Sequence, residues 1–534
     1  MRVLPVVLAF SLSAAASPLV TTTPPKASIS LSTVTGVSSG AVSKFLGIPF
    51  AKAPRFRHAQ AITTYFGALD ATSYGLACPQ QAFGSSAAAN VGAREVVKRH
   101  LKRATSEEGE DCLNLNIITP LNTKSNAKLP VVVWIYGGGF QIGDAADADA
   151  MGTRVVERSI AAGQPVIFVS LNYRVSAYGF LASKEVKAAK LGNIGLEDQR
   201  VGLQWVQKFI ARFGGDNKKV TLWGHSAGAI SIAFQMLHNN GNTGGLFHGA
   251  FMQSGAHVPA GDITKGQKYY DQLVADVGCS SARDTLQCLR TAPLATLRAA
   301  VDRTPNFDGH EGLALAWIPR VDGRWVTDAP QKLLDAGRVA KVPVVTGSVD
   351  DEGTYFSLAQ GNVSTEADFR AWIQTNWAPA ATDAEVDGIL RVYPDDVAAG
   401  SPFDTGANNA IYGQYKRIAA FQGDTVFQAP RRAFLQAVSG RQKAWSYLSK
   451  ILKNQSVLGA FHSSDIELGL MEEFVINFSN KGDPSTAAGP WPTYTNAQPV
   501  MLSFDENGAP GATLDTYRAE AMSYLTEFAK KHQI

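Results

Sequence analysis

Short apolar runs rich in β-branched residues recur along the chain, each bounded by polar residues or glycine. The clearest runs cover residues 131–136, 166–171, 220–223, 342–346 and 444–448. Runs of this length and composition are typical of strands that are buried on both faces of a parallel sheet. Residues 28–46 instead alternate polar and apolar positions, with Gly36 and Gly40 between them, which predicts short antiparallel hairpins.

Helical periodicity separates several of these predicted strands. Between Asp198 and Phe213, apolar residues form a broad stripe at helical spacing, and Gly214 and Gly215 then end the pattern. Strands that alternate with helices indicate a mostly parallel sheet with helices on both faces. Ligands of such sheets bind at the carboxyl ends of strands, so we expect the chemistry in the segments that follow each run.

Residues 220–231 have the pattern of a strand, a Gly-His-Ser-Ala-Gly turn and the start of a helix. A sharp turn from strand to helix brings neighbouring backbones close together, which Gly224 and Gly228 permit. The turn exposes the hydroxyl of Ser226, and the helix directs the free amide of Ala227 at the same point. A G-x-S-x-G sequence is common by chance, but its place between a strand and a helix predicts a nucleophilic serine.

A run of glycines, Gly137-Gly138-Gly139, directly follows the strand predicted at residues 131–136. Consecutive glycines allow the backbone to approach a ligand and turn its N–H groups inward. Such groups stabilise the negative charge that develops on oxygen during acyl transfer. A flexible turn is the alternative, but the position upstream of the serine turn favours an oxyanion hole formed by the amides of Gly138, Gly139 and Ala227.

A serine hydroxyl needs a base that accepts its proton and an acid that orients this base. In folds of this kind the acid, and then the histidine, follow the serine along the chain. Of the six histidines after Ser226, His462 lies in a short loop at the carboxyl end of the strand predicted at 444–448, and it is the predicted base. His310 is the alternative, and the simplest interpretation of that residue is a surface loop.

Three consecutive acidic residues, Asp350, Asp351 and Glu352, follow the strand predicted at residues 342–346. Glu352, beside Gly353, is the predicted acid, and Asp351 is the alternative. A calcium loop or a solvated turn would also gather acidic residues, but the alternating ligand spacing of an EF-hand is missing. We therefore expect no metal, and the chemistry of the serine, the histidine and the acid requires no cofactor.

Residues 1–17 carry a positive residue, a short apolar stretch and a group of small residues, the pattern of a secretory signal. A buried N-terminal helix is the alternative, which Pro18 disfavours. Residues 18–534 would then form a single catalytic domain.

We expect no membrane span or lipid anchor, because no long apolar run or anchoring motif is present. The formal net charge of +3 gives no support for a nucleic-acid partner.

Four cysteines in an exported chain are expected to pair, and proximity along the chain favours Cys78–Cys112 and Cys279–Cys288 among three possible connectivities. Closing these loops is worth about 3–4 and 2–3 kcal/mol respectively in the chain-entropy model.

Three N-x-S sequons predict glycan sites if the host is eukaryotic. They begin at Asn362, Asn454 and Asn477.

Taken together, these motifs resemble the type-B carboxylesterases, which include cholinesterases, fungal lipases of the Candida rugosa type and sterol esterases. The resemblance extends from about residue 45 to residue 471 and rests on ten segments in order: 45–51, 110–116, 136–140, 172–175, 195–199, 213–216, 224–228, 252–255, 351–353 and 461–465. It implies the α/β-hydrolase fold and an acyl-enzyme mechanism. It also implies that the acid is the glutamate of the Asp-Glu-Gly segment, which is Glu352.

The resemblance further implies the same two disulfides and two structural ion pairs, Arg55–Glu110 and Arg174–Asp198. One departure lies next to the nucleophile, where the family commonly has glutamate and this chain has His225. Another concerns the first disulfide loop, which in cholinesterases carries a tryptophan that binds the choline cation. Residues 79–111 contain no tryptophan, so acetylcholine is an unexpected substrate.

In the fungal lipases, the first disulfide loop resembles a flap over the active site. Here residues 79–111 mix valine and leucine with arginine and lysine, which predicts a basic, weakly amphipathic lid helix that touches lipid surfaces. A solvated helix is the alternative.

The sequence thus predicts a secreted carboxylic ester hydrolase acting on small-molecule or lipid esters, with an interfacial lipase or sterol esterase as one alternative. A catalytically silent binding protein is the other, although relatives of that kind lack a complete triad.

Overall fold

The computed structural model describes residues 23–82, 107–467 and 469–533. The predicted secretory signal (1–17) and most of the predicted lid (79–111) lie outside the described residues.

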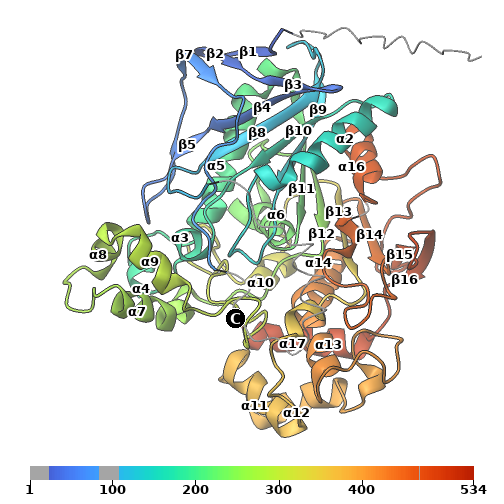
Figure 1. Cartoon of the computed structure of the whole chain (residues 1–534). Helices are drawn as coiled ribbons and strands as arrows, with labels where there is room; N and C mark the ends of the chain where they lie inside the picture. The colour runs from blue at the N-terminus through green and yellow to red at the C-terminus, as the bar shows by residue number, and fades with distance from the viewer. Residues whose placement is uncertain (1–22, 83–106, 468, 534) are drawn as a thin grey trace, which may run out of the picture.

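A large mixed sheet forms the centre of the described part of the molecule (Figure 1). Its eleven strands follow the order β16-β15-β14-β13-β12-β11-β9-β10-β8-β4-β3. The pairs from β10 through β9, β11, β12, β13 and β14 to β15 are parallel, whereas the pairs at both edges are antiparallel. The strands are β3 (Val37–Ser39), β4 (Val42–Pro49), β8 (Asn114–Pro120), β9 (Leu129–Ile135), β10 (Ile167–Leu171), β11 (Gly215–His225), β12 (Gly249–Gln253), β13 (Val344–Val349), β14 (Ala444–Ser449), β15 (Val500–Phe504) and β16 (Pro510–Leu514).

All five strands predicted from the apolar runs are present, as β9, β10, β11, β13 and β14. Every residue of β10, β13 and β14 is buried, as expected for strands covered on both faces. The sequence analysis missed β12, because its Gly-Ala-Phe-Met-Gln sequence lacks the β-branched residues that marked the other central strands.

Helices cover both faces of this sheet (Figure 1). On one face, α2 (Asp149–Ala161) and α16 (Glu472–Lys481) pack against each other and against the central strands. On the other face, α5 (Ile194–Phe209) and α6 (Ala227–Leu237) pack together. The helix predicted at 198–213 begins earlier, at Ile194, after Asn193 in a left-handed conformation, and its last turn is the 3₁₀ helix η2 (Ile210–Phe213).

Two further groups of helices extend below the sheet in the orientation of Figure 1. They are α3 (Ser176–Phe180), α4 (Lys184–Ala188), α7 (Gln267–Asp276), α8 (Thr285–Thr291) and α9 (Leu294–Val301) on one side, and α11 (Glu366–Asn376), α12 (Asp383–Val392), α13 (Tyr415–Gly423) and α17 (Ala519–Lys531) on the other. Nearer to the sheet, α14 (Ala429–Val438) packs against β13, and α10 (Pro330–Asp335) packs against α6 and α14. Within the described chain, every helix is too short or too polar to cross a bilayer.

The antiparallel hairpins predicted at residues 28–46 are present. One joins β1 (Lys26–Ile29) to β2 (Leu31–Thr35) in a small sheet that β7 (Phe66–Asp70) completes. The other joins β3 to β4 at the edge of the large sheet.

The structure contains both expected disulfides, Cys78–Cys112 and Cys279–Cys288. Both expected ion pairs are also present. Arg174 holds Asp198 at 2.6 Å with both side chains buried, and Arg55 holds Glu110 at 2.6 Å. Arg55 also donates to the carbonyl of Ala292, so it links the segments next to the two disulfides.

Candidate active site

Ser226 occupies the sharp turn between the end of β11 and the start of α6. Its φ of +56° is unusual for a residue with a side chain and marks a strained turn. A Cβ atom on Gly228 would lie 2.0 Å from the carbonyl oxygen of Ile135, and one on Gly224 would lie 2.7 Å from the Gly228 backbone. Glycine is therefore required on both sides of this serine, as the motif predicted.

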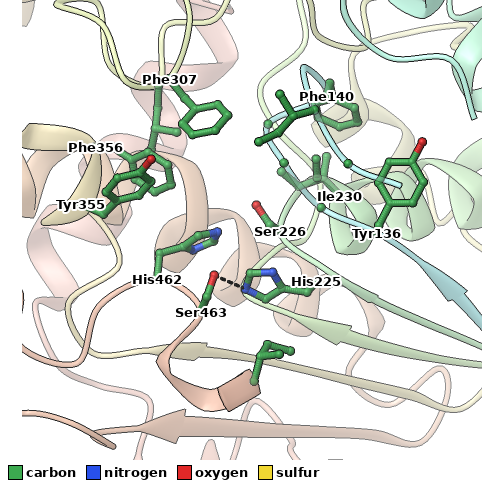
Figure 2. Close-up of a pocket in the computed structure, with 18 of the residues that line it drawn as sticks. Tyr136, Phe140, His225, Ser226, Ile230, Phe307, Tyr355, Phe356, His462 and Ser463 are labelled. Atoms are coloured by element: carbon green, nitrogen blue, oxygen red, sulfur yellow. Dashed lines mark hydrogen bonds between the residues drawn. The ribbon is translucent and has the colours of Figure 1, made fainter. Parts of the chain in front are cut away.

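His462 lies in the loop after β14, where the sequence analysis expected it, and its ring is buried. Its Nδ1 atom is 2.5 Å from Oε2 of Glu352. Because a carboxylate accepts the proton of Nδ1, the lone pair of the neutral ring lies on Nε2. Nε2 is buried and has no hydrogen-bond partner among the described residues. Figure 2 shows the ring facing the same cavity as the Ser226 hydroxyl.

Glu352 and Asp351 are adjacent in the chain, but their carboxylates have different partners. Glu352 accepts the backbone N–H of Val349 at 2.9 Å and contacts His462. Asp351 is bound by the ammonium group of Lys453 at 2.8 Å and by the N–H of Ala460. Lys453 also holds Asp350 at 2.5 Å. The acidic run is therefore held by internal partners rather than arranged as a calcium loop.

The side chains of His462 and Glu352 are both buried, and burial shifts the pKa of each. Burial lowers the pKa of His462, so its imidazole is neutral at physiological pH. Burial raises the pKa of Glu352, and the hydrogen bond from the Val349 N–H partly opposes this shift. A neutral imidazole with a free Nε2 is the form that accepts a proton from a hydroxyl group.

The glycine run after β9 forms a loop beside the serine. Gly138 and Gly139 have φ values of +95° and +62°, and a Cβ atom on Gly138 would lie 2.3 Å from the carbonyl oxygen of Ile142. The amides of Gly138, Gly139 and Ala227 make no hydrogen bond to another residue in the described part of the chain. All three residues line the cavity, so three N–H donors are available near Ser226.

The cavity has a volume of about 290 Å³ and a largely apolar wall. Figure 2 shows aromatic side chains on both sides of Ser226 and His462. The apolar lining includes Phe140, Ile142, Met151, Ile230, Val258, Phe307, Leu313, Leu315, Ile318, Phe356, Val426 and Phe427. Apolar cavities with a few convergent polar groups are typical ligand sites.

His310, the alternative base, does not line this cavity. Its carbonyl oxygen accepts hydrogen bonds from Trp372 and Gln360 instead.

A buried polar network behind the site was missed by the sequence analysis. The carboxylate of Asp465 accepts hydrogen bonds from the hydroxyl of Tyr447 at 2.6 Å and from the amide of Gln253 at 3.0 Å. The carbonyl of Gln253 in turn accepts the N–H of Ser226 at 2.9 Å. The segments 252–255 and 461–465 contributed to the family resemblance, but their spacing alone assigns these residues no role.

Two of the three sequons are accessible in the structure. Asn362 and Asn454 are exposed. Asn477 lies within α16, is only 4% exposed, and donates its side-chain N–H to the carbonyl of Glu473. A glycan on that nitrogen would disrupt this packing, so we retain only Asn362 and Asn454 as proposed glycan sites.

Comparison with known proteins gives a consistent result. The model of the carboxylesterase family matches residues 23–475. Secreted lipase 1 of Botryotinia fuckeliana is 40% identical over 96% of this chain and 93% of that protein. Lipase 4 of Diutina rugosa is 41% identical over 87% of this chain and 88% of that protein.

Among solved structures, EstA from Aspergillus niger has a TM-score of 0.80 at 26% identity and covers 96% of this chain and 99% of its own. PNB esterase has a TM-score of 0.74 at 25% identity and covers 94% and 100% respectively. The fold is thus the α/β-hydrolase fold. With a family match over most of its length and relatives at about 40% identity, the chain belongs to the carboxylesterase family and is a carboxylic ester hydrolase.

Proposed function

We propose that this enzyme cleaves esters through an acyl-enzyme intermediate, with Ser226 as nucleophile, His462 as general base and acid, and Glu352 as the carboxylate that orients His462. The observation that carries the proposal is the 2.5 Å contact between Nδ1 of His462 and Glu352, with the unpartnered Nε2 beside the strained serine turn. These are the elements that activation of a serine hydroxyl requires.

In the first half-reaction, the Oγ atom of Ser226 forms a bond to the ester carbonyl carbon while its proton passes to Nε2 of His462. Glu352 stabilises the resulting imidazolium and fixes its orientation. When the tetrahedral intermediate collapses, the bond to the alkoxy oxygen breaks, and His462 gives the proton to the departing alcohol. The acyl group then remains on Ser226.

In the second half-reaction, a water molecule attacks the acyl carbon and passes a proton to His462. Collapse breaks the bond to Oγ, Ser226 recovers its proton from His462, and the carboxylic acid leaves. Each proton transfer in the two half-reactions passes through His462, and Ser226 ends with its hydroxyl proton restored.

The amides of Gly138, Gly139 and Ala227 are the proposed donors to the oxyanion in both half-reactions. Their N–H groups have no other partner in the described chain and line the same cavity. Each such donor typically contributes about 2.7–4 kcal/mol to stabilising the transition state.

An apolar acyl group is the proposed substrate class, because most of the exposed wall of the cavity is apolar. The same observation favours lipase activity at an interface as the second candidate function. Relatives named as lipases are consistent with it. We further propose that the enzyme is secreted, from the signal pattern at residues 1–17 and the name of the Botryotinia relative.

The test compares the secreted wild type with Ser226→Ala on p-nitrophenyl esters from acetate to palmitate. Loss of activity by several orders of magnitude in the variant is expected. Equal rates in the two proteins would reject the proposed triad. A preference for long acyl chains, with a rate that jumps above the substrate's solubility limit, would identify a lipase, whereas short-chain preference would identify a soluble-substrate esterase.

A further inference from the structure

The imidazole of His225, the residue before Ser226, packs directly against His462. The two ring centroids are 4.7 Å apart, and the planes are tilted by 39°. Figure 2 shows both rings lying beside Ser226 at the floor of the cavity. His225 is buried, and its Nε2 atom lies 3.5 Å from Oγ of Ser463. At this separation, none of the described residues lies between the two rings, so a charge on one ring affects the pKa of the other.

The other groups around His462 divide into carboxylates and apolar rings. Glu352, after β13, contacts Nδ1 directly, and Asp465, on α15 (Ser464–Glu467), stands behind the loop and raises the pKa of His462. Phe356 and Phe427 contact the ring at centroid distances of 5.1 and 4.7 Å.

In the described part of the chain, two basic side chains of this region are paired with other carboxylates. Lys453 is paired with Asp350 and Asp351, and Arg431 is paired with Asp515. Among the described residues, the acidic groups Glu352 and Asp465 favour the imidazolium, and burial, whose effect on the pKa of His462 is larger, favours the neutral ring.

We infer that position 225 is electrostatically coupled to the base, and that its uncharged imidazole, in place of a carboxylate, leaves His462 in its proton-accepting form into the acidic range. This inference rests on the proposed function, in which His462 is the base. A carboxylate at position 225 would be the third around this ring and would stabilise its protonated form. Protonated His462 accepts no proton from Ser226.

His225 is itself neutral over the relevant range. Burial and the adjacent His462 lower the pKa of His225 to about 3, against an opposing effect of Asp465. It therefore adds neither a positive nor a negative charge next to the base above that pH, while it fills the space between the Gly137 loop and Ser463.

The experiment compares wild type, His225→Gln and His225→Glu, since glutamine and glutamate have the same shape and differ in charge. The measurement is the acidic limb of kcat/KM for a p-nitrophenyl ester from about pH 2.5 to pH 8. We expect the midpoint of His225→Glu to lie about 1–3 pH units above that of His225→Gln, the usual effect of a charge within 4–6 Å. Wild type and His225→Gln should share a midpoint, although their maximal rates differ.

Identical midpoints of the acidic limb in the glutamine and glutamate variants would overturn the inference. They would show that a charge at position 225 does not change the pKa of His462. A midpoint that rises equally in both variants would also overturn it, by showing that ring packing and not charge is responsible. If His225→Glu does not fold, Ser463→Asp against Ser463→Asn introduces the same charge from the other side of His225. That position has φ +84°, which Asp and Asn tolerate better than other branched or bulky residues.

Failure of the inference and failure of the proposed function are distinguishable. Full activity in Ser226→Ala would reject the proposed function at any pH. An inactive Ser226→Ala combined with matching midpoints in the position-225 variants would reject only the role of His225.

Discussion

The Nδ1 atom of His462 lies 2.5 Å from Oε2 of Glu352, although the two residues are 110 positions apart in the chain. Their loops follow β13 and β14, which are neighbouring parallel strands. An isolated bridge between Asp351 and Phe461 extends that pairing beyond the strand ends. The residue after each bridged position is then Glu352 on one side and His462 on the other, so backbone pairing brings the two side chains together.

This arrangement predicts different consequences for the two adjacent acids. Glu352→Gln should lower kcat by about 10³–10⁴-fold, because the amide cannot hold the tautomer of His462 that leaves Nε2 free. Asp351→Asn should change kcat far less but destabilise the fold by about 1–3 kcal/mol, because it removes one of the two carboxylates that pair with the buried Lys453, while Asp350 remains. Kinetics together with urea denaturation of each variant measure both effects. A catalytic loss confined to Asp351→Asn would reverse the assignment.

The glycine loop predicts a loss of rate that backbone strain alone would not produce. In Gly139→Ala, the new Cβ atom would lie 2.7 Å from the Phe307 ring at a φ of +62°. The donors should then shift, and kcat should fall by about 10²–10³-fold. Gly163→Ala is the control, since Gly163 has a similar φ of +67°, has open space around it and does not line the cavity. That control should cost about 1–2 kcal/mol of stability at unchanged kcat. Equal kinetic effects would exclude a special role for the loop.

His257 predicts how stability depends on pH. The side chain is 1% exposed, and burial lowers its pKa to about 3, from about 6.5 in the unfolded chain. Between these values the unfolded state binds more protons, so the free energy of unfolding should fall as pH decreases from about 6.5 to about 3. His257→Gln should reduce that slope by about 1 kcal/mol per pH unit. Denaturant titrations at several pH values measure it, with His310→Gln, at a half-buried loop residue outside the cavity, as the control. An unchanged slope in His257→Gln would show that this histidine is not held neutral by the fold.

The accessibility of the sequons predicts the glycosylation pattern in a eukaryotic host. Peptide mapping before and after enzymatic deglycosylation should find modification at Asn362 or Asn454 and none at Asn477, which is buried in α16. Asn477→Gln should consequently leave the mass of the glycosylated protein unchanged apart from the substitution. A glycan on Asn477 would mean that α16 packs differently in the secreted enzyme.

Much of the fold was predictable because its signals are local. Buried parallel strands need unbroken apolar runs, so the sequence marked β9, β10, β11, β13 and β14. The serine turn needs glycine at two fixed positions because backbone atoms approach there, and these glycines are visible in the sequence. β12 was missed because its composition has low strand propensity, and its burial between neighbouring elements stabilises the strand conformation.

Other features were decided only by the tertiary structure. The sequence placed Asp351 and Glu352 side by side and left both open as the acid on residue chemistry alone. Pairing of β13 with β14 determines which carboxylate faces His462 and which faces Lys453. The burial of Asn477 and the packing of His225 against His462 depend likewise on segments distant in the chain. Local sequence therefore determined the elements and the turn chemistry, whereas side-chain partners depended on long-range packing, which no short window of residues contains.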